Sequence, residues 1–254
     1  MLWEQVLQVD RVWLIAHDTD VLEPEQVAAY LALEQRRQQG EPMAYLIGQR
    51  EFMGHMFQVS PAVLIPRPDT EVLVQTALQL IQNVPEPRIL DLGTGSGAIA
   101  ISLALARPDA QVYASDVSAE ALQVAQSNAQ RLCGKVEFCA GNWYDAIVGH
   151  AAFDLIVSNP PYIAADDHHL VQGDIRFEPR GALTDEADGL SDLRVIITQA
   201  ADYLRDSAWL LLEHGWDQAL AVQDLLRQAN YLTIHTYQDL AGMDRVTGGQ
   251  ISTS

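Results

Sequence analysis

The residues Asn159-Pro160-Pro161-Tyr162 are the part of this sequence with the clearest potential for chemistry. They follow the apolar run 153–158, which has the pattern of a buried strand, and the two prolines end that strand in a turn. Proline has no N–H, so the backbone here offers carbonyl acceptors with few competing donors. An NH2 group brings two donors, one for the Asn159 side-chain oxygen and one for the Pro160 carbonyl. The tetrapeptide therefore predicts a site that holds an amide or amine nitrogen; the alternative is a proline turn with a surface tyrosine.

A second candidate is the glycine-rich turn Gly93-Thr94-Gly95-Ser96-Gly97, which follows the apolar strand pattern 88–92 and precedes an apolar helix. Glycine is favoured in such a turn because the backbone takes positive φ and a cofactor must approach it without meeting a Cβ. The dinucleotide fingerprint has its third glycine one position later, and here Asp91 stands two residues before the first. The turn predicts a nucleotide-type cofactor site, with a purely structural turn as the alternative.

Two further predicted strands end at residues that suit a cofactor. The strand 111–115 leads to Asp116, 23 residues after Gly93, and an acid near this offset binds ribose hydroxyls. Alternatively, Asp116 and Ser118 begin the next helix. The strand 135–139 leads to Asn142-Trp143, whose amide and aromatic ring could flank an adenine, although a large aromatic residue also serves the core.

Together these motifs resemble those of the release factor glutamine methyltransferase family. The glycine-rich turn with Asp91 is similar to the first motif of class I S-adenosylmethionine methyltransferases, and further similar segments are 48–52, 64–71, 176–179 and 212–215. The resemblance covers nearly the whole chain. It implies an α/β fold with a doubly wound, Rossmann-like class I methyltransferase sheet, a small amino-terminal helical domain and a linking β-hairpin. It also implies an S-adenosylmethionine-dependent enzyme that methylates the glutamine of the Gly-Gly-Gln motif in class I peptide-chain release factors.

The resemblance also implies roles for individual residues. The expected cofactor-binding residues are Gly93, Thr94, Gly95, Ser96, Gly97, Asp116, Asn142, Trp143 and Asn159. The expected substrate-binding residues are Asn159, Pro160, Pro161, Tyr162 and Arg67, of which Asn159, Pro160 and Tyr162 are the expected catalytic residues. Glu71, like Arg67, is expected to support the site from behind the residues that contact the cofactor and the substrate. Alternatively, Pro68 and Asp69 begin a helix, and Glu71 favours the dipole of its first turn.

The charge of the chain bears on its substrate. There are 15 basic and 34 acidic residues, which gives a net charge of -19, and Lys135 is the only lysine. Nucleic-acid binding requires basic residues that neutralise phosphates, so no stable nucleic-acid binding is expected, although Arg176, Arg180 and Arg67 could form a local patch. An adenine-N6 DNA methyltransferase, which can carry the same tetrapeptide and must flip a base, is therefore the weaker alternative. A glutamine methyltransferase acting on a ribosomal protein is the nearer one.

The length and composition favour one large or two unequal domains. Cys133 and Cys139 form neither a disulfide framework nor a zinc pattern, and the seven histidines show no ligand spacing, so no metal is expected. The start of the sequence has no basic leader, and the apolar runs are too short for a bilayer. These features predict a cytoplasmic enzyme, which we expect to be a monomer.

The order of predicted elements divides the chain into three parts: a helical substrate-recruiting domain at 1–49, a β-hairpin linker at 50–67 and a methyltransferase domain at 68–254. The resemblance implies that the first part is shorter than that of the family by about one helix, so a start site upstream or a trimmed recruiting domain is an alternative. The expected helices are 2–7, 10–16, 24–39, 42–47, 70–82, 97–107, 118–132, 191–204 and 217–228. The expected strands are 88–92, 111–115, 135–139, 153–158, 207–213, 231–236 and one near 244–247. Gly248-Gly249-Gln250 is expected to be a chance match in a loose tail after this last strand.

Overall fold

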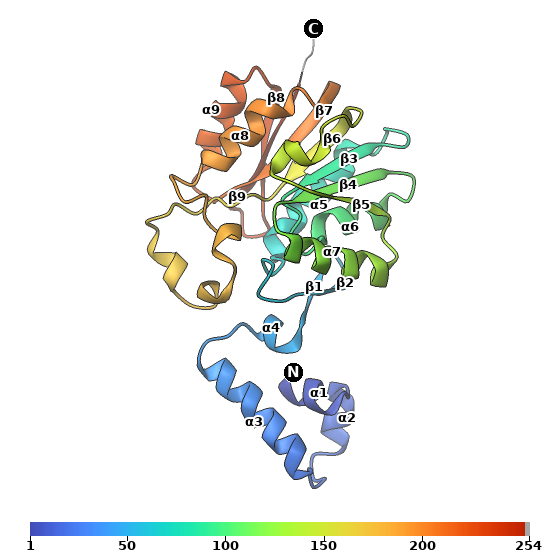
Figure 1. The fold of residues 1–254 in the computed structure, drawn as a ribbon, viewed down its shortest axis with the longest axis vertical. Helices are drawn as coiled ribbons and strands as arrows, with labels where there is room; N and C mark the ends of the chain where they lie inside the picture. The colour runs from blue at the N-terminus through green and yellow to red at the C-terminus, as the bar shows by residue number, and fades with distance from the viewer. Residues whose placement is uncertain (252–254) are drawn as a thin grey trace.

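Seven strands form one sheet in the computed structural model, which describes residues 1–251, and their order is β5-β4-β3-β6-β7-β9-β8 (Figure 1). The strands β3, β4, β5, β6 and β7 run parallel to one another, whereas β9 runs antiparallel to its neighbours β7 and β8. Their bounds are β3 Arg88–Leu92, β4 Gln111–Asp116, β5 Val136–Ala140, β6 Phe153–Ser158, β7 Leu204–Glu213, β8 Leu232–Gln238 and β9 Asp244–Gln250. The predicted doubly wound sheet is confirmed.

Helices cover both faces of this sheet (Figure 1). Residues of α5 (Glu71–Leu80), α6 (Ala98–Ala106) and α7 (Ala119–Leu132) contribute to one apolar core. Residues of α8 (Ser191–Ala200) and α9 (Ala219–Gln228) contribute to the other. The strands β3 and β6 supply alternate residues to the two cores, which is why they read as continuous apolar runs in the sequence.

One predicted boundary is wrong. The helix expected to reach residue 204 ends at Ala200, and β7 begins at Leu204 instead of 207. The cause lies in the sheet, because the Phe153 backbone N–H donates to the Tyr203 carbonyl at 2.8 Å and Leu204 pairs with Phe153. These long-range backbone bonds override the helical preference of the local sequence.

The amino-terminal helices extend away from the sheet (Figure 1). They are α1 Leu2–Leu7, α2 Arg11–Ala16, α3 Pro24–Gln38 and α4 Met43–Ile47. The helix α3 begins with a capping box formed by Glu23 and Gln26, and Gly40 follows its end with φ 95°. The helices α1 to α3 contain no buried residue. No described helix is both long and apolar enough to cross a bilayer.

The predicted hairpin is formed by β1 (Gln49–Phe52) and β2 (His55–Gln58). Its turn residues Met53 and Gly54 both have positive φ, as a two-residue hairpin turn requires. Phe52 and Phe57 are buried, so the hairpin belongs to the core of the sheet domain. Short 3-10 helices lie in the remaining connections at Pro68–Thr70, Trp143–Ile147, His168–Val171, Ile175–Phe177 and Arg180–Ala182.

The expectation for Gly248-Gly249-Gln250 is wrong. These residues lie within β9, where Gly248 pairs with Leu211 of β7 and His235 of β8. Both glycines are buried, and a Cβ on Gly248 would collide with the Leu211 side chain and lie 2.8 Å from the Leu210 carbonyl oxygen. Glycine is therefore needed here for close packing inside a sheet, and it does not loosen the chain.

Candidate active site

A cavity of about 350 Å³ lies at the carboxyl ends of the parallel strands, where open α/β sheets bind their ligands. Most residues that the sequence singled out contribute to its wall. They are Arg67, Gly93, Thr94, Gly95, Ser96, Asp116, Asn142, Trp143, Asn159 and Pro161. Gly97, Pro160 and Tyr162 are not among the lining residues.

The glycine-rich turn is fixed to the neighbouring strand by its backbone. The N–H groups of Gly93 and Thr94 both donate to the Ser115 carbonyl at 2.9 Å. Gly93 has φ 72°, and an added Cβ would lie 3.2 Å from the Trp143 ring. Gly97 has a structural role: it has φ 81° at the start of α6, and an added Cβ would meet Ile101 at 2.8 Å. At Gly95, by contrast, an added Cβ would have no atom within 4 Å. The backbone of the turn is therefore open to a ligand at Gly95.

Asp116 satisfies both interpretations made from the sequence. One carboxylate oxygen accepts from the Gly95 N–H at 2.8 Å, and the other accepts from the Ser118 N–H at 2.8 Å. Ser118 itself begins α7, because its hydroxyl accepts from the Ala121 N–H at 3.1 Å. Asp116 also lines the cavity, so it joins the glycine-rich turn to the next helix while facing the ligand space.

Beneath the turn, Asp91 is completely buried. Its Oδ2 accepts from the Thr94 hydroxyl at 2.6 Å and from the Ala100 N–H at 3.2 Å, whereas Oδ1 has no hydrogen-bond partner. Burial raises the pKa of Asp91 to about 7, and the two hydrogen bonds oppose this shift. A buried oxygen without a partner next to the cavity wall is suited to a ligand or a water molecule bound there.

Trp143 and Asp192 form a second side of the cavity. Both line it, and the Trp143 side chain donates a hydrogen bond to the Asp192 carboxylate. Burial, together with the charge of Asp185, raises the pKa of Asp192, which the bond from Trp143 opposes. Asn142 precedes Trp143 and is exposed at the same wall. Trp143 is thus held by both Gly93 and Asp192, and it serves the cavity wall as well as the core.

Asn159 follows β6, whose end is fixed by Ser158: the Ser158 hydroxyl donates to the Leu92 carbonyl at 2.7 Å. The Asn159 NH2 group donates to the Thr70 hydroxyl oxygen at 3.4 Å. The Thr70 hydroxyl in turn hydrogen-bonds to the Glu213 carboxyl. Thr70 is thus the acceptor and the Asn159 NH2 group the donor in this contact. The Asn159 side-chain oxygen therefore remains free, and no described residue donates to it.

Tyr162 and Glu213 do not line the cavity and lie behind Asn159 and Thr70. The Tyr162 hydroxyl donates to Glu213 at 3.5 Å, and burial followed by the nearby carboxylate raises the pKa of Tyr162. Gln218 donates to the Tyr162 carbonyl at 2.9 Å, which fixes the end of the tetrapeptide. Pro160 is buried, and no described residue donates to its carbonyl oxygen. The tetrapeptide thus retains two acceptors without a donor among the described residues, the Pro160 carbonyl and the Asn159 side-chain oxygen.

Arg67 and Glu71 occupy different positions. Arg67 lines the cavity and forms an ion pair with the buried Glu178, which also accepts from the Ile65 N–H at 3.0 Å. Among the described residues of the cavity wall, Arg67 is the only basic one. Glu71 does not line the cavity; it accepts from the Met53 N–H at 3.1 Å and holds the hairpin turn.

Thr70, Asp192 and Glu213 were not selected as site residues from the sequence. Thr70 and Glu213 lie within segments that resemble the family, but neither type nor spacing indicated that they meet. Asp192 appears in the sequence only as an acid in the first turn of a helix, which is a common stabilising position. Their roles depend on contacts between distant segments.

The pKa of Glu213 leads to a prediction about stability. Burial raises it to about 7, while the Thr70 hydrogen bond and the Arg245 charge act in the opposite direction. The folded chain therefore binds a proton that the unfolded chain has lost between about pH 4.5 and 7, so stability should fall as the pH rises through this range. Glu213→Gln should remove the part of this loss of stability that Glu213 causes, on the order of 3 kcal/mol, whereas the part caused by Asp91 should remain. Denaturant unfolding at several pH values measures it, and an unchanged slope would contradict the prediction.

Proteins of a known family match nearly the whole chain. Residues 1–48 match the family model described as PrmC N-terminal domain, and residues 69–183 match the methyltransferase small domain. A release factor glutamine methyltransferase of Bordetella pertussis is 57% identical over 99% of this chain and 93% of its own. That of Neisseria gonorrhoeae is 48% identical over 98% of this chain and 91% of its own. The chain belongs to the release factor glutamine methyltransferase family.

As a member of the release factor glutamine methyltransferase family, the chain is a methyltransferase, and its cofactor is S-adenosylmethionine. The fold agrees: a methyltransferase of Pyrococcus furiosus superposes with a TM-score of 0.58 over 86% of this chain and 98% of its own, at 17% identity. The cavity suits this cofactor, because it has the size of small-molecule sites, about 300–1,000 Å³. Asp116 and Asp192 are acids in its wall, while the single basic group, Arg67, is paired. This balance suits a cationic sulfonium.

Proposed function

We propose that this chain transfers a methyl group from S-adenosylmethionine to the side-chain amide nitrogen of glutamine in the Gly-Gly-Gln motif of class I peptide-chain release factors, in the cytoplasm. The names of its relatives support the reaction class and the substrate. The observation that carries the proposal for the site is the orientation of Asn159. Its NH2 group is engaged by Thr70, so its oxygen is available to a substrate N–H at the cavity.

In this proposal, the cofactor binds against Gly93, Thr94, Gly95 and Ser96, and Gly97 keeps the turn in shape. Asp116 accepts hydrogen bonds from the ribose hydroxyls, and Asn142 and Trp143 flank the adenine. Asp91 lies beneath the turn and offers its unpartnered oxygen. Each of these roles uses a group that the fold already fixes, which limits the ordering that binding must bring about.

The substrate glutamine is proposed to place one amide N–H on the Asn159 oxygen and the other on the Pro160 carbonyl. An amide nitrogen is a weak nucleophile, so the main contribution of the chain is to hold it close and oriented, which effective-molarity arguments value at about 7 kcal/mol or more at best. Two acceptors also favour the positive charge that develops on this nitrogen. When bound, the cofactor supplies an electrophilic methyl group on its sulfonium sulfur. Pro161 lines the site, and Tyr162 holds Glu213 behind it.

Labelled S-adenosylmethionine with three acceptors tests the proposal. The purified chain is incubated with a release factor, a ribosomal-protein mixture and duplex DNA, and a release factor whose motif glutamine is replaced by glutamate serves as the control. We expect label in the intact release factor alone. Label in the ribosomal proteins alone would favour the second candidate, and label in DNA alone would overturn the assignment to a protein substrate.

We further propose the division of labour expected from the sequence, in which residues 1–49 recruit the release factor, 50–67 link, and 68–254 perform the chemistry. Exposed apolar side chains on the amino-terminal helices support recruitment: Ile15 of α2 is 69% exposed and Leu31 of α3 is 53% exposed. These two side chains are open to an apolar surface of a partner. The proposed complex is one chain with one release factor.

Ile15→Glu combined with Leu31→Glu should raise the KM for an intact release factor by roughly tenfold or more. Each substitution replaces an apolar contact by a carboxylate that must be desolvated when the partner binds. The affinity for the cofactor, measured by calorimetry, should be unchanged. Leu240→Glu is the matched control, since Leu240 is fully exposed in the turn between β8 and β9. An unchanged KM in the double variant would exclude this surface from substrate recruitment.

A further inference from the structure

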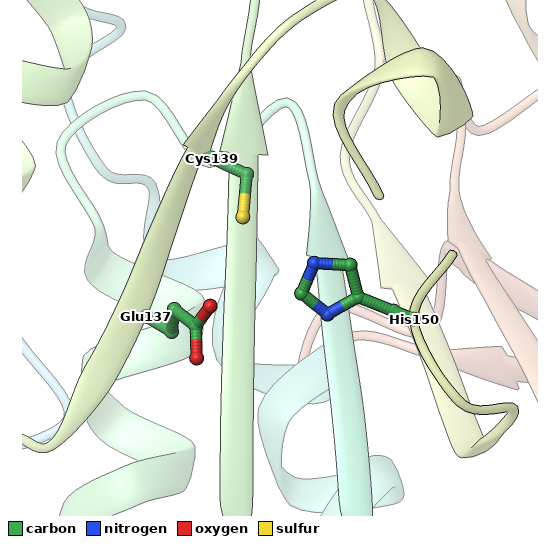
Figure 2. Close-up of side chains that lie close together, drawn as sticks. All are labelled: Glu137, Cys139 and His150. Carbon is green, nitrogen blue, oxygen red and sulfur yellow. The ribbon is translucent and has the colours of Figure 1, made fainter. Parts of the chain in front are cut away.

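Glu137, Cys139 and His150 bring three different metal-binding groups together outside the cavity (Figure 2). Their ligand atoms, a carboxylate oxygen, the Cys139 sulfur and a ring nitrogen of His150, all lie within 4.8 Å of one another. In a tetrahedral zinc site with bonds of about 2.0–2.3 Å, neighbouring ligand atoms are about 3.3–3.8 Å apart. Small side-chain rotations would close this difference.

The fold explains why the three groups meet. In β5, Val136 and Phe138 pack into the core beside α6 and α7, so the alternate residues Glu137 and Cys139 face the other side of the sheet. His150 reaches this side from the connection between β5 and β6 (Figure 2). The connection is held in place by Arg88, which donates to the Ala151 carbonyl at 3.3 Å.

The three side chains are free to bind an ion. Among the residues that the structure describes, none of the three side chains forms a hydrogen bond or an ion pair, and the His150 ring contacts Tyr113 edge to face at 5.2 Å. A second group, Asp167, His168 and His169, differs in this respect. There the Asp167 carboxylate already accepts from the His169 N–H at 2.8 Å and contacts its ring nitrogen at 2.7 Å, at the start of the 3-10 helix His168–Val171.

We propose that Glu137, Cys139 and His150 form a zinc site with one open position for water. A thiolate, an imidazole and a carboxylate are the ligands that Zn²⁺ takes in proteins, whereas Mg²⁺ and Ca²⁺ require oxygen ligands throughout. Binding displaces the Cys139 thiol proton to solvent and involves no redox change. The cluster comprises two strand residues and one loop residue, so bound zinc cross-links β5 to the connection that follows it.

The position of this cross-link gives it an effect on the cofactor site. Asn142 and Trp143, which line the cavity, lie between Cys139 and His150 in the chain. Zinc bound at the cluster therefore closes a short loop that contains Asn142 and Trp143, and it restricts the motion of these residues without contacting the cofactor. The site is regulatory and structural, and it adds no chemistry to methyl transfer.

Cobalt spectroscopy on the full, reduced chain tests the site. Titration with Co²⁺ should produce a thiolate-to-cobalt charge-transfer band that saturates at one equivalent of Co²⁺ per chain. Added Zn²⁺ should abolish this band by competition. Cys139→Ser should remove the band and weaken zinc binding by roughly a hundredfold or more. Cys133→Ser is the matched control, because Cys133 is the other free cysteine and is exposed at the end of α7. It should keep the band at full intensity.

Further variants separate this cluster from other binding. His150→Gln should weaken zinc binding, whereas His169→Gln should not, and zinc should raise the melting temperature of the wild type but not of Cys139→Ser. Circular dichroism establishes that each variant is folded, and Glu137→Gln replaces Cys139→Ser in the comparison if the latter is not. No band in the wild type, or a band that survives in Cys139→Ser, would overturn the proposal.

Discussion

Asn159→Ala should lower the rate of methyl transfer by about 10²–10³, while the affinity for the cofactor falls much less. The variant removes the acceptor that faces the cavity, and with it one of the two contacts proposed for the substrate NH2 group. Single-turnover kinetics with a release factor measure the rate, and calorimetry measures cofactor affinity. Wild-type turnover by Asn159→Ala would leave the proline pair as an ordinary end of a strand.

Asn159→Asp refines this test. It keeps an acceptor but loses the NH2 group that donates to Thr70, and it places a second carboxylate near Glu213. The added charge also stabilises the sulfonium of the bound cofactor before reaction, and stabilisation of the ground state opposes catalysis. We expect this variant to bind the cofactor at least as well as the wild type and to react more slowly.

Asp116→Ala should weaken cofactor binding by roughly tenfold to a hundredfold. A charge-assisted hydrogen bond contributes about 1.5–3 kcal/mol, and the ribose hydroxyls would lose their acceptor. The glycine-rich turn would also lose the bond from Gly95 that Asp116 accepts. Calorimetry with S-adenosylmethionine measures the effect.

Ser118→Ala is the control for Asp116. It removes the hydroxyl that begins α7 and leaves the Asp116 carboxylate in place. If Asp116 acted only through the start of this helix, the two variants would bind the cofactor equally well. A clear loss in Asp116→Ala alone shows that Asp116 acts at the cavity, through the ribose contact or the Gly95 bond, and not through the start of α7.

The elements of the fold could be predicted from the sequence because they depend on local patterns. The buried runs at 88–92 and 153–158 and the glycine turn between strand and helix are each visible within about ten residues. The parallel sheet then brings successive strand ends together, and Gly95, Asp116 and Asn159, each selected from the sequence, line one cavity at that edge.

What the sequence could not reveal depends on contacts between distant segments. Asn159 and Thr70 are 89 residues apart, and Tyr162 and Glu213 are 51 residues apart, so no periodicity connects them. The same applies to Gly248, whose neighbours in β7 and β8 make glycine necessary. Glycine near the end of a chain favours a loose tail when it is considered alone, and only the packing around it reverses that reading.

The chain contains a copy of the tripeptide that it is proposed to methylate, and β9 keeps that copy from acting as a substrate. The Gln250 side-chain amide already donates to the Ser207 carbonyl at 2.6 Å. Gln250 pairs with Trp209, four residues before Glu213 along β7, which puts it about 13 Å from the strand end at the cavity. Release of this glutamine would require the sheet to open between β7 and β8. While β9 stays paired on both sides, the tripeptide copy is not presented to the cavity as a substrate or as a competitor of one.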